Sequence, residues 1–217
     1  MKTRSIALAA MVAVSLGAQA APLTTYAPWD AAYPSIAGVK FNVASAGAVT
    51  VALGAHAYKT SVNLPNNGTD TFYAQSGTYA PDGLNRANWS FDFFVTLATG
   101  ATCTGCTVRL LVDTDPTATS TLVQLFNLPV STGGDSWNME MAFGSGGFAG
   151  LPGNLLQNSY NFNPFASSST AFALVVNDGN GGELVRSDIT VNVPEPGSLA
   201  MVGLALAGVA ALRRRKV

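Results

Sequence analysis

Two cysteines three positions apart, in Cys103-Thr104-Gly105-Cys106, are the first residues of this chain that could do chemistry. Such a pair can form a disulfide, act as a redox centre or supply two of four zinc ligands. A redox pair needs a helix N-terminus that lowers the thiol pKa, whereas residues 107–112 have a β-strand composition. The chain shows no two further zinc ligands at suitable spacing. The sequence therefore favours a structural disulfide between Cys103 and Cys106, at a hairpin tip.

The only histidine, His56, would have to serve any Ser-His-Asp arrangement. No nucleophile motif nominates a partner, because glycines flank Ser145 directly instead of standing two positions away. Between residues 22 and 193 the only glutamates are Glu140 and Glu183, and no carboxylate pair stands out for glycoside hydrolysis. We therefore expect His56 to be solvent-exposed or hydrogen-bonded for structural reasons, and the protein to have no catalytic residues and not to be an enzyme.

Two carboxylates, Asp113 and Asp115, follow a predicted strand and could face one Ca²⁺ ion, which takes oxygen ligands. The stretch Asn177-Asp178-Gly179-Asn180 is also rich in oxygen atoms. Neither has the Asp-x-Asp-x-Asp-Gly spacing of a calcium loop, and Asp and Asn commonly bond to their own backbone in turns. Turn chemistry is the preferred interpretation. We expect no cofactor and keep Asp113 and Asp115 as the calcium candidates.

Several aromatic residues fall outside the alternating patterns described below and could stack on the pyranose rings of a polysaccharide. They are Tyr26, Trp29, Tyr33, Tyr58, Tyr73 and Tyr79. Trp89 and Trp137 follow the alternation and are predicted core residues. Phe94 lies on the otherwise polar face of its strand, so we expect it to cover a second layer or a partner.

The elements that hold these residues are predicted to be β-strands. Apolar and polar residues alternate with a period of two in residues 89–98, 137–143 and 188–193. Weaker strands are expected over 39–43, 49–53, 71–79, 107–112, 121–126 and 170–176. Turn residues separate them at 66–68, 81–83, 133–135 and 177–182. With no strong amphipathic helix, this pattern predicts an all-β body over residues 22–193, an antiparallel β-sandwich of jelly-roll or immunoglobulin-like type.

Charge is distributed unevenly along the chain. Between residues 22 and 193 there are five basic and eleven acidic residues, a net charge of −6, although the formal charge of the whole chain is −1. Nucleic-acid binding requires Lys and Arg clustered against phosphates. The body has scattered cations and an acidic balance, so nucleic acid is excluded as a partner.

Residues 1–21 contain the three parts of a secretory signal peptide. Lys2 and Arg4 form the charged region, residues 6–16 are apolar, and Ala18-Gln19-Ala20 is an A-x-A cleavage site, with cleavage predicted before Ala21. We expect this signal helix to direct export, with signal peptidase as a processing enzyme.

Residues 194–217 differ in composition from the body. Pro194-Glu195-Pro196 cannot continue a strand or helix smoothly, because proline fixes φ and has no N–H. Residues 198–212 carry no charge; as a helix they would span about 22 Å, short against a hydrocarbon core of about 30 Å. Arg213, Arg214, Arg215 and Lys216 follow and should stay in the cytoplasm. We predict a short transmembrane helix that holds the chain in the inner membrane in transit, with the body outside.

This tail resembles the PEP-CTERM sorting signal of Gram-negative bacteria. The matching features are Val193-Pro194-Glu195-Pro196, an apolar run containing Gly203 and Gly208, and the basic end at residues 213–216. The resemblance covers 24 of the 217 residues and concerns sorting only. It implies that an exosortase, a membrane transpeptidase-like protease, acts at or near Pro194-Glu195-Pro196. It also implies a final location at the cell surface or in the extracellular matrix, with exopolysaccharide and biofilm.

Three functions remain open for the body. The leading expectation is a non-enzymatic, exported surface or matrix protein. One alternative is a carbohydrate-binding module for extracellular polysaccharide, with Trp29 as the candidate residue for a test. The other is a secreted hydrolase with no recognisable motif, whose activity would depend on a carboxylate or on His56.

Overall fold

Ten strands form two five-stranded sheets in the part of the chain that the computed structural model describes, residues 21–82, 86–113, 121–139 and 163–194. Sheet A has the order β1 (Thr24–Thr25), β2 (Lys40–Ala46), β3 (Val49–Ala57), β5 (Trp89–Leu97) and β8 (Gly133–Asn138). Sheet B has the order β4 (Thr71–Tyr73), β10 (Glu183–Val193), β9 (Ser168–Asn177), β6 (Thr107–Asp113) and β7 (Leu122–Pro129). The helical elements are α1 (Ala27–Ala32) and two short 3₁₀ turns, η1 (Pro34–Ile36) and η2 (Ala80–Asp82).

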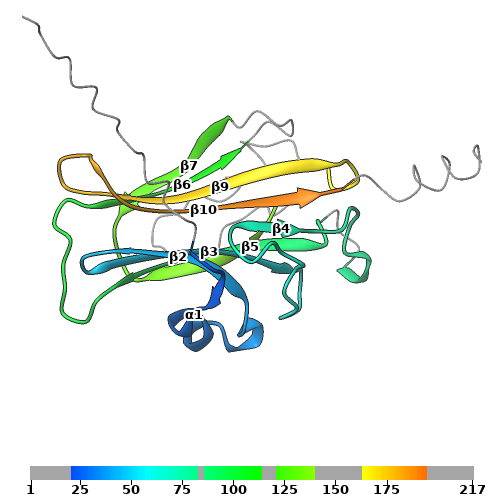
Figure 1. Cartoon of the computed structure of the whole chain (residues 1–217), viewed down its shortest axis with the longest axis horizontal. Helices are drawn as coiled ribbons and strands as arrows, with labels where there is room; N and C mark the ends of the chain where they lie inside the picture. The colour runs from blue at the N-terminus through cyan, green and yellow to red at the C-terminus, as the bar shows by residue number, and fades with distance from the viewer. Residues whose placement is uncertain (1–20, 83–85, 114–120, 140–162, 195–217) are drawn as a thin grey trace, which may run out of the picture.

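The two sheets lie face to face, with β9 and β10 above β2, β3 and β5 in Figure 1. Their inner faces share one core, because alternate side chains of each strand point to the same side. Phe91 of sheet A stacks on Phe172 of sheet B with ring centroids 4.4 Å apart, and Trp89 and Trp137 are buried in this core as predicted. The mainly β architecture predicted from the alternation is confirmed.

One pair of strands departs from the antiparallel prediction. β4 runs parallel to β10, with Thr71 opposite Thr190 and Tyr73 opposite Asn192. The topology permits this pairing, because β4 and β10 are far apart in the chain and no hairpin, which would make them antiparallel, joins them. β4 is also only three residues long, much shorter than the predicted 71–79.

The strand that contains Trp137 begins earlier than predicted. Gly133, Gly134 and Asp135 were expected to form a turn, and this prediction is wrong, because they are the first residues of β8. Gly134 lies so close to its neighbour that a Cβ atom there would be 2.1 Å from the Phe93 carbonyl oxygen. Glycine here permits close strand contact. Of the predicted segment 137–143, residues 140–143 lie outside the described part of the chain.

A second, smaller cluster of apolar side chains covers the outer face of sheet A. This outer cluster consists of Trp29, Val39, Phe41, Ala52 and Phe94. Trp29 comes from α1, which lies on the side of sheet A away from sheet B (Figure 1). The prediction that Phe94 covers a second layer is confirmed, and that layer is the N-terminal segment, whose β1 lies at the edge of sheet A next to β2.

Candidate functional site

The Pro-Glu-Pro motif begins where the last strand ends. Val193 is buried and pairs with Ser168 of β9, whereas Pro194 is exposed. Proline has no N–H to donate to a neighbouring strand, so the ladder cannot continue through it. The folded body and the predicted sorting tail therefore meet at a single point of the chain.

Most residues of the two predicted targeting segments lie outside the described part of the chain. These are Ala18 and Ala20 of the cleavage site, Glu195 and Pro196 of the motif, the apolar run 198–212, and Arg213, Arg214, Arg215 and Lys216. Ala21, the predicted first residue after cleavage, is exposed. None of the helices within residues 21–82, 86–113, 121–139 and 163–194 has the length and hydropathy needed to cross a membrane.

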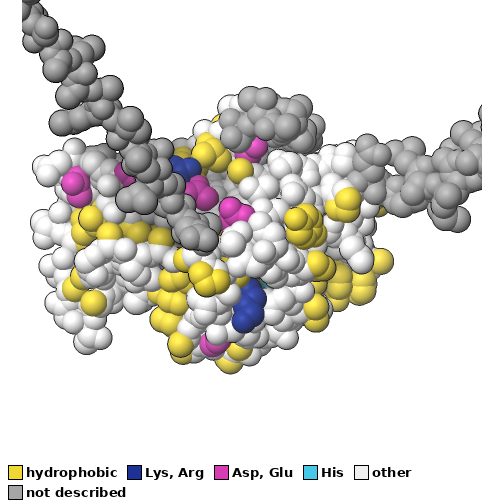
Figure 2. All heavy atoms as spheres, in the orientation of Figure 1, with side chains coloured by type: hydrophobic (Ala, Val, Ile, Leu, Met, Phe, Trp, Pro, Cys, Tyr) yellow, Lys and Arg dark blue, Asp and Glu magenta, His cyan; other side chains and the backbone are white. Residues whose placement is uncertain are grey.

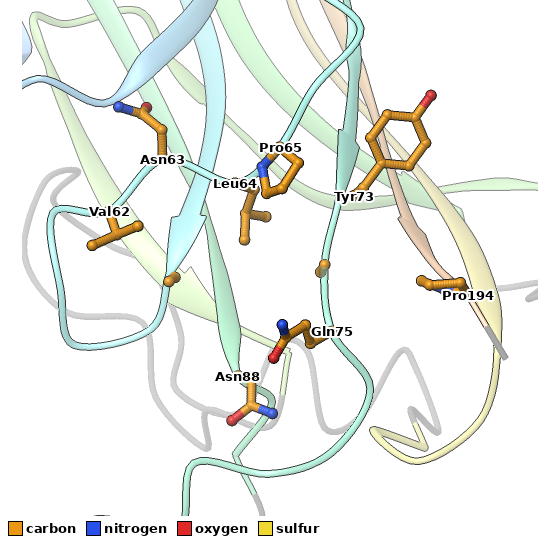
Figure 3. A pocket seen from close by; sticks show the side chains of 10 residues that line it. Val62, Asn63, Leu64, Pro65, Tyr73, Gln75, Asn88 and Pro194 are labelled. Carbon is orange, nitrogen blue, oxygen red and sulfur yellow. The ribbon is translucent and has the colours of Figure 1, made fainter. Parts of the chain in front are cut away.

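A groove of about 420 Å³ opens beside the end of β10, with Pro194 in its lining. Figure 3 shows Tyr73 and Gln75 on one side and Val62, Leu64 and Asn88 on the other. Tyr73 is 44% exposed and Val62 is 61% exposed, so the groove offers apolar surface to solvent. On the face drawn in Figure 2, hydrophobic side chains form several separate patches, and the acidic ones are scattered.

A smaller cleft of about 280 Å³ lies over the polar part of the outer face of sheet A. Its floor holds His56 of β3, whose Nδ1 is 2.7 Å from Oδ2 of Asp92 on β5. The strand register places Ser90 opposite His56 and Ser136 opposite Asp92. Both serines line the cleft with His56. The fold thus brings together polar residues that lie far apart in the sequence.

The His56–Asp92 pair is buried, with side-chain exposures of 3% and 0%. Burial lowers the pKa of His56, but the charge of Asp92 and the hydrogen bond to it together outweigh burial, so the pKa lies above its ordinary value. Burial, with the charges of Asp135 and Asp92, raises the pKa of Tyr33 to about 12. Tyr33 therefore stays protonated at neutral pH, and its hydroxyl donates to the Gly134 carbonyl at the neighbouring edge of the sheet.

A hydrogen-bonded His–Asp pair can orient an imidazole for acid–base chemistry, but nucleophilic catalysis also requires a serine hydroxyl bonded to that imidazole. Within the described residues, no hydrogen bond joins His56 to Ser90 or Ser136. The expectation that His56 is structural and hydrogen-bonded agrees with its contact to Asp92, but a position in solvent does not, because the side chain is buried. Sequence reasoning did not select Asp92 or Ser90; an aspartate within the Phe-rich strand 89–97 was the available signal.

Cys103 and Cys106 lie at disulfide distance, with their Cα atoms 5.3 Å apart. The prediction that they sit at a hairpin tip is wrong, because β5 belongs to sheet A and the next strand, β6, to sheet B. The pair therefore lies in a connection that passes between the sheets. Residues 98–106 separate the two strands, more than the two to five residues, roughly, of a typical hairpin loop.

The calcium candidates receive no support from the described residues. Asp113 is buried, and its Oδ1 accepts a hydrogen bond from the Thr121 N–H, while Asp115 lies outside the described part of the chain. No group of three or more potential metal ligands of the His, Cys, Asp and Glu types occurs where the structure is described. Asp178 serves the β9–β10 turn, accepting hydrogen bonds from the N–H groups of Asn180 and Gly182.

The six aromatic candidates for sugar stacking separate into different environments. Trp29 is fully buried in the outer cluster, so its proposed role in a sugar platform is wrong. Tyr58 is also buried. Tyr73 is the member of this set that stands among the exposed large hydrophobic side chains, and it lines the groove.

Comparison with protein families gives one match, which covers residues 192–216 and is described as the PEP-CTERM protein-sorting motif. The match begins within β10 and includes the groove residue Pro194. It indicates export and sorting to the cell surface and implies processing by an exosortase. Searches of curated proteins and of solved structures return no significant match to this chain.

Proposed function

We propose that this chain is an exported, non-enzymatic protein of the cell surface or extracellular matrix, delivered by its C-terminal sorting motif. The observation that carries the proposal is the position of the motif: Val193 is buried at the end of β10 and Pro194 is exposed. A protease that acts after Val193 would therefore remove the tail without breaking a strand of the sandwich. Loss of the tail would leave both described sheets intact.

In this proposal the processing enzymes act in sequence. Signal peptidase cleaves before Ala21, the apolar run 198–212 holds the chain in the inner membrane of a Gram-negative cell, and residues 213–216 remain in the cytoplasm. An exosortase then acts near Pro194-Glu195-Pro196. The body is released or transferred to the surface, where we expect it to associate with exopolysaccharide and biofilm matrix.

The short spacer between the body and the apolar run limits where the groove can lie before processing. Only Glu195, Pro196 and Gly197 separate Pro194 from Ser198. The four Cα–Cα steps from Pro194 to Ser198 span at most about 14 Å when the chain is fully extended. With the run 198–212 in a membrane, Pro194 at the rim of the groove would be held close to the lipid surface, and processing would remove this constraint.

The test of sorting is the intact mass of the protein from cell-surface, medium and membrane fractions. The wild type is expected to end near residues 193–196, with or without a covalent adduct. A variant with Pro194→Ala, Glu195→Ala and Pro196→Ala is expected to stay in the membrane fraction with a mass extending to Val217. Pro129→Ala, an exposed proline at the end of β7, is the matched control. A wild-type mass running from about Ala21 through Val217 in every fraction would contradict processing, and the tail would then serve only as a membrane anchor.

A second candidate function is carbohydrate binding by the groove. The observation that favours it is the half-exposed ring of Tyr73, which lines the same groove as the amide side chains of Gln75 and Asn88. An apolar surface with a few polar groups is the usual composition of a small-ligand site, and a flat ring can stack on a sugar.

This candidate predicts saturable binding of a polysaccharide fragment that is weakened about tenfold by Tyr73→Ala, because the ring contact is lost. Tyr73→Phe should retain most of the affinity. Val123→Ala, at an exposed apolar position on β7, is the control and should bind as the wild type does. A glycan array without any bound sugar would exclude the candidate.

A further inference from the structure

The cleft over His56 combines basic and hydroxyl-bearing side chains. Its described lining consists of Ile36, His56, Tyr58, Lys59, Arg86, Ser90 and Ser136, with no carboxylate among them. Residues 22–193 contain only five basic side chains against eleven acidic ones, and two of those five line this cleft. Two of the five basic side chains of an acidic body therefore line this cleft.

Tyr58 holds both basic side chains close to the cleft. The Nζ atom of Lys59 lies 5.4 Å from the centroid of the Tyr58 ring, and the Cζ atom of Arg86 lies 5.9 Å from it. Nη1 of Arg86 also donates a hydrogen bond of 2.6 Å to the Tyr58 hydroxyl. Each contact restricts a long side chain that would otherwise lose conformational entropy on binding a ligand.

The backbone at Lys59 adopts a conformation that disfavours its side chain. Lys59 has φ of +62°, and it is the one non-glycine residue with positive φ in the described part of the chain. Both the N–H and the hydroxyl of Thr60 donate to the Ala57 carbonyl, which fixes this turn. Glycine would adopt the same turn without strain, so the presence of lysine here points to a use for its side chain.

The buried Asn138 fixes the main chain at Ala87 and Trp89, next to the cleft residues Arg86 and Ser90. Asn138 accepts a hydrogen bond from the Ala87 N–H and donates to the carbonyls of Ala87 and Trp89. Ala87 follows Arg86 and Trp89 precedes Ser90, so one side chain positions both residues. The Arg86 carbonyl in turn accepts a hydrogen bond from the Tyr79 N–H.

We propose that this cleft is a binding site for an anionic group of a ligand, a carboxylate, sulfate or phosphate held between Lys59, Arg86 and His56, with the Ser90 and Ser136 hydroxyls as further donors. Charge-assisted hydrogen bonds from Arg and Lys are the strongest polar contacts available to such groups. The volume of about 280 Å³ lies just below the roughly 300–1,000 Å³ of sites for drug-sized ligands. It suits one charged group or a single charged sugar ring.

His56, on the floor of the cleft, supplies a further polar group for the anion. Its Nδ1 is engaged by Asp92, which leaves Nε2 as the other polar atom of the ring. The raised pKa of His56 increases the share of the protonated ring, which can donate from Nε2 and balances the charge of Asp92 beneath it. This site is separate from the groove at Tyr73 and depends on neither the sorting motif nor glycan binding there.

The test uses His56 itself, because one histidine in the chain gives one pair of imidazole C–H resonances in a proton NMR spectrum. The protein recovered from the cell surface is titrated with galacturonate, with inorganic phosphate and with neutral galactose at constant ionic strength. Saturable shifts of the His56 resonances with galacturonate, with phosphate or with both, and none with galactose, are expected. A shift with one anion alone assigns the site to carboxylates or to phosphate esters.

Lys59→Gln is the decisive variant, because Lys59 is exposed and its loss should leave the fold intact. It is expected to weaken binding about tenfold, the effect of losing one hydrogen bond to a charged group. Arg86→Gln is expected to do the same. Arg186→Gln removes an equal charge from sheet B and should bind within about twofold of the wild type. Absence of a shift with both anions, an equal shift with galactose, or wild-type affinity in Lys59→Gln would overturn the proposal.

Discussion

Replacing His56 with leucine is expected to destabilise the protein by roughly 3–5 kcal/mol, because it leaves a buried charge without its partner. Asp92 is fully buried. Its Oδ2 bonds to His56, while its Oδ1 has no hydrogen-bond partner in the described part of the chain. Without the imidazole, the carboxylate would lose the hydrogen bond that compensates for its removal from water. Unfolding in urea measures the change, with the m-value as a check on two-state behaviour.

The matched control is the double variant His56→Leu/Asp92→Asn. The amide side chain keeps the shape of aspartate but carries no charge, so the double variant should be more stable than His56→Leu alone. If the two variants unfold at the same urea concentration, the cost arises from lost packing at position 56, and the charge argument fails.

The double variant His56→Leu/Asp92→Asn should also alter how the free energy of unfolding depends on pH. The pKa of folded His56 lies above its ordinary value, so its pair with Asp92 contributes full stability below the unfolded pKa of about 6.5. This contribution is lost as pH rises through the folded pKa. The other ionisable groups nearby are Lys59, Arg86 and Tyr58 at the cleft, together with Asp135 and Tyr33, and the pKa of about 12 keeps Tyr33 neutral in this range. The wild type should therefore lose stability on the alkaline side of pH 6.5, and the double variant should lose less.

The strand pattern was predictable because apolar residues recur at every second position of a strand that has one face on the core. Strand 89–97 follows this alternation, although Ser90 and Asp92 on its polar face are also buried in the structure, and Phe94 on that face packs into the outer cluster. The His56–Asp92 contact could not be derived in the same way. That contact depends on the register between β3 and β5, which sets Gly54 opposite Asp92. In the chain, 31 residues separate the end of β3 at Ala57 from the start of β5 at Trp89.

Glycine was the residue type that most misled the prediction. Gly133 and Gly134 have the composition of a turn, yet they are the first residues of β8, and at Gly134 the atoms of Phe93 and Phe94 on the neighbouring strand leave no room for a side chain. Gly181, in contrast, has φ of +84° in the β9–β10 turn, as its surroundings predicted. A glycine that permits a turn and one that permits close contact look alike until the neighbouring strand is known.

The sorting tail was recognisable because its signals are contiguous: a Pro-Glu-Pro motif, an apolar run and a basic end occupy residues 194–216. The residues that line the cleft at His56 come from four separate parts of the chain: position 36, residues 56–59, residues 86–90 and position 136. No single stretch carries a motif. A site assembled by strand pairing is therefore visible only after the sheet is built.

Trp29→Ala is expected to cost about 3–5 kcal/mol, the range for removing a large buried aromatic side chain. The ring has no exposed surface and packs against Tyr33 at 4.3 Å and Phe41 at 5.2 Å between centroids. Its Nε1 also donates to the Ile36 carbonyl. These contacts attach α1 and η1 to sheet A, so the loss should fall first on the N-terminal segment.

Hydrogen exchange would locate this loss. Because the outer cluster is separate from the core between the sheets, amide protection should fall in residues 26–38 while β9 and β10 keep theirs. Tyr73→Ala, at an exposed aromatic position, is the control and should change stability by no more than about 0.5 kcal/mol. If Trp29→Ala instead kept full stability and lost binding to a glycan, Trp29 would have to be reachable from solvent, and the outer layer formed by α1 would have to open in solution.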